Sequence, residues 1–174
     1  SLTTPNSNGI TNVTLNTINR TSGIDEGYIL TTDSTLLFID SSYTLNVTFF
    51  DQSSPGVWID WNQDGDFSDA GEVIVSPFGS WYPSNGGFPK TQAFTVPSSA
   101  LEGTTRMRVY AKDGTGPVSG PCETTDPGGD IEDYIINVKR SKYLDVAPVS
   151  VDYLSSADSS FVNIQSDSIW TSTT

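Results

Sequence analysis

Apolar and polar residues alternate along several short segments of this chain, and no segment repeats with the period of an amphipathic helix. The clearest alternation lies in 43–49 and in 105–110, where polar and apolar side chains take turns. Such alternation places the apolar side chains on one face of a half-buried β-strand. The pattern therefore predicts an all-β fold.

Further strands are expected where short apolar or alternating segments are bounded by turn residues. These segments are 13–18, 35–39, 57–61, 72–75, 92–96 and 133–138. Many short strands separated by turns rich in glycine and proline are typical of two packed antiparallel sheets. We therefore expect an antiparallel two-sheet β-sandwich, Ig-like or jelly-roll-like, with an acidic loop inserted between two of its strands.

The ends of the chain differ from its middle. Residues 1–9 are mainly polar and are expected to form a linker, and residues 10–140 are expected to form the sandwich. Three of the chain's eight basic residues, Lys139, Arg140 and Lys142, mark the boundary. Residues 141–174 are too few for an independent sandwich. They are expected either to pack on the first domain or to begin a second one.

The charge of the chain limits its partners. There are 21 acidic residues against 8 basic ones, which gives a formal net charge of -13. Because nucleic acids and anionic membrane surfaces bind through Lys and Arg, we expect neither as a partner. No apolar run approaches the roughly 18–20 residues of a membrane span, so no membrane insertion is expected. An extracellular protein fits this composition, and we expect any export signal to lie outside this sequence.

Catalysis is not expected. The chain has no histidine, so the commonest general base and zinc ligand is missing. Its acids cluster in a hydrophilic loop, which favours the ionised carboxylate over the proton donor that a glycosidase needs. The single cysteine, Cys122, precedes Glu123, and a neighbouring acid does not stabilise a thiolate. With one cysteine, no disulfide can form within this sequence.

The densest group of metal-ligand residues lies in 60–72. Oxygen-bearing side chains recur at every second residue, and Gly65 falls where the backbone must turn sharply, as in the first half of an EF-hand calcium loop. The twelfth position is Gly71, so the acid follows one residue late, and a strand rather than a helix precedes the loop. We expect a structural Ca²⁺ ion, with Asp69 as a reserve ligand and with the ligands Asp60, Asn62, Asp64, Asp66 and Glu72. The alternative is an acidic hairpin loop whose Asp and Asn side chains only form Asx turns.

A second acidic group comprises Asp130, Glu132 and Asp133. Arg106 and Arg108 share one face of a predicted strand, so we expect structural ion pairs between these arginines and Glu132 or Asp133. The alternative is that Glu132 or Asp133 completes the calcium site from a neighbouring loop.

Aromatic residues gather in the long loop that spans 76–90. Trp81, Tyr82 and Phe88, with Asn85 as a polar neighbour, are candidates for stacking on sugar rings, because loops on rigid scaffolds often carry binding residues. The alternative is that Trp81 and Tyr82 fold back as a lid over the sandwich core.

Several motifs occur together in an order that resembles the GEVED domain. The segments that carry the resemblance are 58–67, 71–72, 94–97, 103–109, 121–122 and 129–134. Together they cover roughly residues 10–139, and Asp130 and Ile131 stand where the family signature has Glu and Val. The resemblance implies a β-sandwich accessory module of large secreted or surface proteins of Bacteroidetes, beside peptidases, glycoside hydrolases or adhesin-like repeats. It also implies a disulfide at the position of Cys122, but the second cysteine of that pair is missing here.

The tail is similar to the opening of another Bacteroidetes β-sandwich, the BACON domain. The similar segments are 149–151, 162–166 and 169–172, about a third of such a domain.

These observations predict a non-catalytic, calcium-stabilised module of a secreted or cell-surface protein, which binds polysaccharide and so targets its parent enzyme or adhesin. The expected partners are polysaccharide and other domains of the same parent chain, and the module itself is expected to be a monomer. The alternative function is a structural spacer or a protein-contact module without a small ligand.

Overall fold

The computed structural model describes residues 9–24, 26–50, 53–76, 89–113, 118–122 and 129–141. This part of the chain is built from β-strands and contains no helix. The strands are β1 (Gly9–Leu15), β2 (Ile18–Thr21), β3 (Tyr28–Phe38), β4 (Ser42–Phe50), β5 (Ser53–Ile59), β6 (Val73–Val75), β7 (Pro89–Thr95), β8 (Gly103–Asp113) and β9 (Asp130–Lys139).

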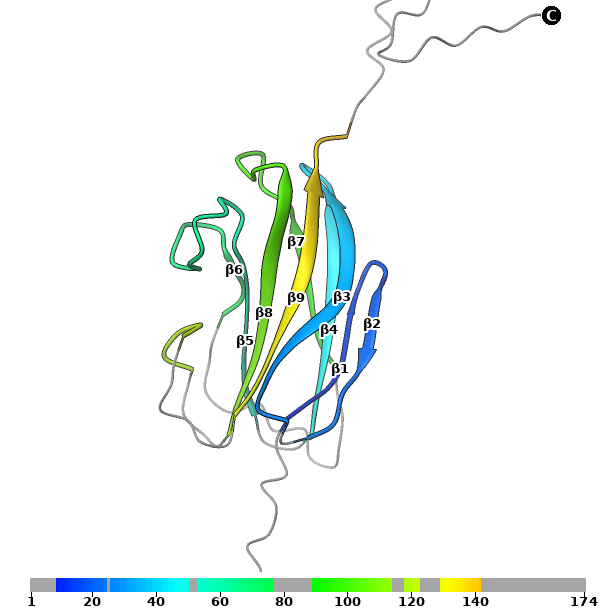
Figure 1. Ribbon diagram of the computed structural model, residues 1–174, viewed down its shortest axis with the longest axis vertical. Helices are drawn as coiled ribbons and strands as arrows, with labels where there is room; N and C mark the ends of the chain where they lie inside the picture. Colours follow the sequence, from blue (N-terminus) through cyan, green and yellow to red (C-terminus); the bar gives the residue numbers. More distant parts are fainter. Residues whose placement is uncertain are drawn as a thin grey trace, which may run out of the picture. The chain divides into compact units, whose positions relative to one another are not determined.

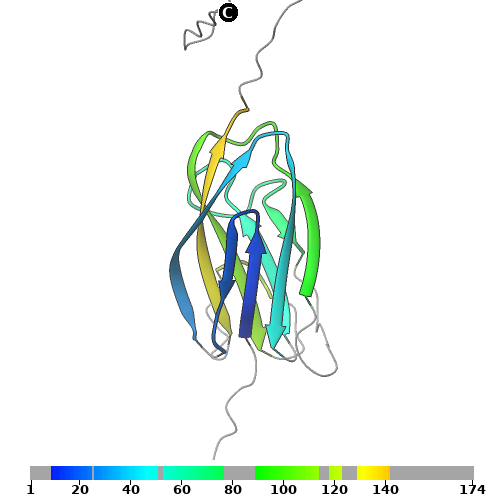
Figure 2. The same cartoon turned by 90° about the vertical axis from the view of Figure 1, so that its right-hand side faces the viewer.

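The strands form two facing sheets, which confirms the predicted β-sandwich. One sheet has four strands in the order β2-β1-β4-β7, and the other has five in the order β3-β9-β8-β5-β6 (Figure 1). Figure 2 shows the four-stranded sheet turned toward the viewer. The apolar faces of both sheets meet in one core, whose largest fully buried side chains include Phe49, Leu45, Met107, Tyr134 and Ile136. Full burial of such side chains stabilises the fold by about 1.5–3 kcal/mol each.

One strand pair departs from the expected antiparallel arrangement, because β3 and β9 run parallel. After β3 the chain crosses to the other sheet instead of returning as a hairpin. Ile39 still donates its N–H to Lys139 of the five-stranded sheet, whereas the next residue, Asp40, donates to Val96 beside the four-stranded sheet. The chain leaves the five-stranded sheet at the end of β3 and returns to it later. It then forms β9 between β3 and β8, in the same direction as β3. Parallel neighbours require such a long connection.

The predicted strand 13–18 is in fact two strands, β1 and β2, which form a hairpin. Asn16 lies in the turn with a φ of 50°, a left-handed conformation that Asn adopts more readily than most residues. Its side-chain amide donates to the carbonyl of Leu36, which holds the turn against β3. Leu15 and Ile18 lie on either side of the turn and are both buried. The apolar pattern therefore did not reveal that the chain reverses direction between them.

The outer face of the five-stranded sheet, turned away from the four-stranded sheet, carries a second apolar cluster. Trp58 and Tyr110 of the sheet pack there with Phe67 and Val118, which come from loops. Gly56 lies under the Trp58 ring, and a Cβ atom at Gly56 would come within 2.1 Å of that ring. Phe67 belongs to the acidic segment 60–72, so this cluster anchors the segment to the sheet.

The two predicted termini lie almost wholly outside the described residues. The compact unit that contains the sandwich ends at Arg140. The linker 1–9, the tail 141–174 and the tail's BACON-like segments therefore stay predictions.

Candidate functional site

The acidic segment 60–72, which we call the acidic loop, connects β5 to β6 and is fastened to the sandwich by backbone hydrogen bonds. Asp60 donates its N–H to the carbonyl of Arg106 at 3.1 Å, and Trp61 accepts the N–H of Leu101 at 2.9 Å. The Trp61 ring lies in the main core against Phe94. The loop therefore starts from rigid backbone.

Glu72 closes the loop from its other end. Its side chain is buried, and both carboxylate oxygens accept backbone N–H groups, from Trp61 at 2.9 Å and from Asp69 at 3.2 Å. These bonds tie the end of the loop to its beginning. They also give the late acid a structural role that the calcium-loop spacing alone did not indicate.

Three successive Asx turns shape the middle of the loop. Asn62 Oδ1 accepts the N–H of Asp64 at 3.2 Å, and Asp64 Oδ1 accepts the N–H of Asp66 at 3.0 Å. Asp66 Oδ1 then accepts both the hydroxyl and the N–H of Ser68, at 2.7 and 2.8 Å. The Ser68 hydroxyl, followed by its N–H, lowers the pKa of Asp66 below its ordinary value.

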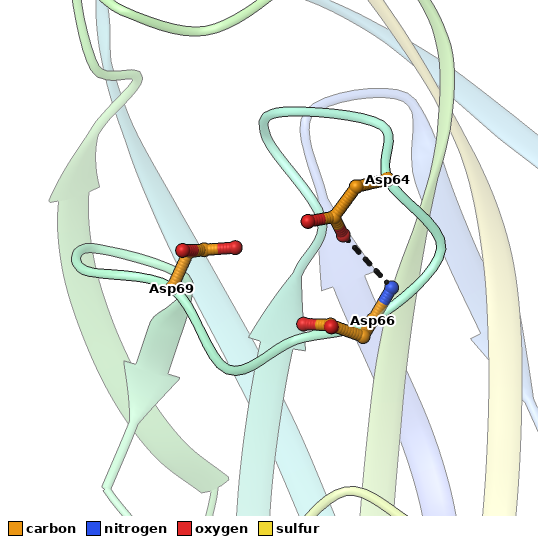
Figure 3. A group of neighbouring side chains, drawn as sticks. All are labelled: Asp64, Asp66 and Asp69. Atoms are coloured by element: carbon orange, nitrogen blue, oxygen red, sulfur yellow. Dashed lines mark hydrogen bonds between the residues drawn. The ribbon is translucent and has the colours of Figure 1, made fainter.

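Three carboxylates of the acidic loop face a common space. Carboxylate oxygens of Asp64, Asp66 and Asp69 lie within 4.8 Å of one another, and Figure 3 shows them converging from two arms of the loop. We call these residues the three-acid group. All three side chains are exposed, and oxygen atoms at this spacing can hold a metal ion. The amide nitrogen of Asn62 lies between two of them, 3.0 Å from Asp64 Oδ2 and 2.8 Å from Asp69 Oδ2.

Asp60 lies under the loop with only 6% of its surface exposed. Its Oδ2 accepts the N–H of Gly65 at 3.2 Å, whereas its buried Oδ1 has no hydrogen-bond donor in the described part of the chain. Gly65 has a φ of 93°, which favours glycine, and a Cβ there would meet no atom within 4 Å. The conformation, not a lack of space, therefore requires glycine at this turn.

The predicted ligand residues thus divide into two layers. Asp64 and Asp66 of the predicted set come together with the reserve residue Asp69. Asp60 and Glu72 are buried beneath them, and the structure does not bring either into the three-acid group.

Beside the loop, an ion pair lies on the outer face of the five-stranded sheet. Asp133 of β9 is fully buried and accepts two hydrogen bonds from Arg108 of β8, Nε–Oδ1 and Nη2–Oδ2, each 2.8 Å long. Tyr28 of β3 donates its hydroxyl to Asp133 Oδ2 at 2.9 Å. Arg106 is more distant, with its Nη1 3.4 Å from Asp133 Oδ2. Both arginines considered from the sequence therefore pair with Asp133. We call Asp133, Arg108 and Tyr28 the arginine clamp.

The arginine clamp also holds the acidic loop. The Arg108 guanidinium lies 5.5 Å from the centroid of the Phe67 ring and 5.8 Å from that of Tyr28. Its Nη1 donates to the carbonyl of Pro121 at 2.9 Å. The hydrogen bonds to Asp133 raise the pKa of Arg108 above its ordinary value.

Glu132 points to the other face of β9 and does not pair with Arg106 or Arg108. It accepts the hydroxyl of Tyr134 and lies 3.9 Å from Arg20 Nε. Burial raises the pKa of Glu132 above its ordinary value. Neither Glu132 nor Asp133 belongs to the three-acid group.

Asp130 serves as an anchor at the start of β9. Its carboxylate accepts the N–H of Ile10 at 3.3 Å and that of Gly27 at 2.9 Å, which ties β1 and the start of β3 to β9. The partners Arg20, Tyr28 and Phe67 were not foreseen, because their roles depend on which strands are neighbours. The predicted sugar-binding residues Trp81, Tyr82, Asn85 and Phe88 lie outside the described residues.

We predict that Asp133→Asn lowers the free energy of unfolding by about 3–5 kcal/mol, because the partly buried Arg108 is then left without its buried counter-charge. Chemical denaturation followed by tryptophan fluorescence measures the change. Asp33→Asn is the matched control, since Asp33 forms a more exposed pair with Arg20 and should cost only about 0–1 kcal/mol. Equal losses in the two variants would contradict the role assigned to the clamp.

We predict that Glu132→Gln becomes more stable relative to the native protein as the pH rises from about 4 to about 7. The folded-state pKa of Glu132 is raised, so its protonated form is favoured by folding. The stability that it contributes is full below its unfolded pKa and falls as the pH rises through the folded value. Glutamine does not titrate, so thermal melting across this range should show a growing difference. A difference that is constant with pH would refute the assignment.

Comparison with known families agrees with this structure. Residues 55–137 match the family model of the GEVED domain, which indicates an accessory module of a multidomain protein. The match covers the acidic loop, the arginine clamp strands β8 and β9, and the signature segment 129–134. No curated protein sequence matches the chain. In the described residues, no helix is long and apolar enough to cross a membrane. The match of residues 55–137 supports the GEVED resemblance that the motifs predicted.

Proposed function

We propose that this GEVED domain is a calcium-stabilised, carbohydrate-binding module of a secreted or cell-surface protein. The three-acid group of Asp64, Asp66 and Asp69 is the observation that carries the calcium part of the proposal. Three like charges this close repel one another, and a bound divalent cation removes that repulsion.

Two further features support a cation in the acidic loop. A buried carboxylate oxygen without a donor, such as Asp60 Oδ1, is costly unless an ion or water satisfies it. Asn62, a further oxygen-bearing side chain, lies beside Asp64 and Asp69. Oxygen ligands of this kind favour a hard cation such as Ca²⁺ over zinc or copper.

The role of this ion is structural. Glu72 joins the two ends of the acidic loop, and Phe67 joins the loop to the sheet, so a cation there would stiffen a segment that the sandwich already holds. At a free concentration of 100 times its Kd, the ion would add about 2.7 kcal/mol to the free energy of unfolding.

We predict that chelation lowers the melting temperature of the native protein and that added Ca²⁺ restores it. The double variant Asp64→Asn/Asp66→Asn should lose most of this calcium-dependent shift, because two of the three carboxylates are removed. Thermal melting with and without chelator measures the shift, and titration calorimetry gives the stoichiometry. Asp40→Asn is the matched control, since Asp40 is an exposed acid with a positive φ that Asn also adopts. Equal calcium responses in the double variant and the native protein would reject this site.

The carbohydrate part of the proposal comes from the aromatic segment 76–90, whose Trp81, Tyr82 and Phe88 offer flat apolar faces to sugar rings. Binding there would hold the parent enzyme or adhesin on polysaccharide, with the other domains of the parent chain as the remaining partners.

One observation favours a second candidate, a structural spacer or protein-contact module. The acids of the segment 129–134 are all engaged in hydrogen bonds or ion pairs within the protein. A module whose signature residues serve only stability suits a spacer.

We predict that affinity gel electrophoresis against plant, algal and microbial polysaccharides shows retardation by at least one polymer in the presence of Ca²⁺. Retardation should be lost in Trp81→Ala/Tyr82→Ala, because the stacking platform is removed. Phe50→Ala, which removes a partly exposed ring from β4, is the control and should still be retarded. No retardation across a broad panel, with the protein folded and calcium bound, would favour the spacer function instead.

A further inference from the structure

A cleft of about 460 Å³ lies beside the acidic loop, on the outer face of the five-stranded sheet. Its volume lies within the roughly 300–1,000 Å³ that is usual for small-ligand sites. Its lining comes from four parts of the chain and includes Leu30, Gln63, Phe67, Thr104, Arg106 and Ile135.

The alternation of side chains fixes which face the cleft occupies. On β8, Thr105, Met107 and Val109 face the main core, so Thr104 and Arg106 project from the outer face. On β9, Tyr134 and Ile136 face the core, so Ile135 also projects outward. The cleft is therefore open to solvent on a sheet face that the sandwich core does not use.

Arg106 is the cation of this cleft, and its side chain is 51% exposed. Its partner among the described residues, Asp133, already accepts two 2.8 Å bonds from Arg108 and one from Tyr28. The Arg106–Asp133 approach, at 3.4 Å, is the longest of these contacts. Because Asp133 is satisfied without it, the Arg106 guanidinium keeps donors for a planar carboxylate, which it can bind with two parallel hydrogen bonds.

The rest of the lining fits the remainder of a sugar ring. Leu30 is 60% exposed and lies with Ile135 and Phe67, so the cleft offers apolar contact to the C–H groups of a pyranose. The Thr104 hydroxyl donates to Asn137 Oδ1, so its own lone pairs remain as acceptors for a sugar hydroxyl. Apolar contacts beside the guanidinium group of Arg106 suit a ligand that carries a carboxylate on a compact ring.

The wall of the cleft on one side is the acidic loop itself. Gln63, Gly65 and Phe67 of the loop line the cleft, together with the buried Asp60. A cation in the loop would offset negative charge next to an incoming carboxylate in a protein whose net charge is -13. The two ligands should therefore assist each other, and by linkage each should raise the affinity of the other by the same factor.

We propose that this cleft binds an acidic saccharide, with a uronate carboxylate on Arg106 and with Ca²⁺ in the acidic loop strengthening the binding. This inference rests on the proposed function as a carbohydrate-binding module, and it names a second site and a ligand class for it.

The test uses a short oligogalacturonate as the probe and its fully methyl-esterified form as the neutral counterpart, which differs only in the carboxylate. Amide NMR titration of the full chain should show shifts at Leu30, Gly65, Thr104 and Ile135. Calorimetry should show that Arg106→Gln binds the acidic probe about tenfold or more weakly. Arg106→Lys should recover only part of the affinity, because lysine keeps the positive charge but cannot donate two parallel hydrogen bonds to a carboxylate.

Arg140→Gln is the matched control, because it removes an exposed cation whose pair with Glu102 is 3.9 Å long. It should bind the probe as the native protein does. Melting curves should show that Arg106→Gln remains folded, since Arg108 and Tyr28 still hold Asp133.

The inference would be overturned if the acidic probe did not bind, if the ester bound equally well, or if Arg106→Gln bound the probe as the native protein does. It would also be overturned if Asp66→Asn lost binding of the probe while Arg106→Gln retained it. The last result would mean that calcium bridges the probe to the loop. A different result would reject the cleft and still retain the proposed function. Retardation by a neutral polysaccharide that depends on Trp81 and Tyr82 but not on Arg106 would retain the module and reject the cleft.

Discussion

The pair between Arg108 and Asp133 is the interaction on which the five-stranded sheet most depends. These residues are directly opposite each other in the register of β8 and β9, and Asp133 is fully buried. A charged pair out of water is favourable only when its geometry is good and its remaining hydrogen-bond capacity is satisfied. Here two short bonds from Arg108 and the hydroxyl of Tyr28 meet that requirement, and they join β3, β9 and β8. A slip of one residue in the β8–β9 register would leave a bare carboxylate inside the protein, so the pair helps to specify the pairing.

The same logic explains why an acidic protein places acids inside its fold. Asp130 accepts backbone N–H groups from two distant segments, and Glu132 accepts the hydroxyl of Tyr134 close to Arg20. Each carboxylate joins parts of the chain that are far apart in sequence. The signature of the GEVED family in this chain, 129–134, is therefore a set of structural contacts, and it need not mark a ligand site.

In the acidic loop, Asx turns occur together with a group of acids that could hold a metal ion. The Asx turns form through Asn62, Asp64 and Asp66, and the same turns bring the free oxygens of the three-acid group together. Phe67 connects this loop to Arg108 and hence to the arginine clamp. Phe67 also lines the cleft that contains Arg106.

The sequence by itself determined the all-β class, the two-sheet sandwich, the family and the position of the acidic loop, because these follow from local alternation, turn residues and fixed spacing. It also indicated that Arg106 and Arg108 would meet an acid of β9. Only the tertiary structure decided that β3 and β9 are parallel, that 13–18 is a hairpin, and that Glu72 closes the loop instead of joining the three-acid group. The partnership of Tyr28 with Asp133 and the cleft lined by Leu30 and Arg106 also belong to the tertiary structure. These features depend on which strands become neighbours and in what register, and contacts between residues so far apart in the chain leave no periodic pattern in the sequence.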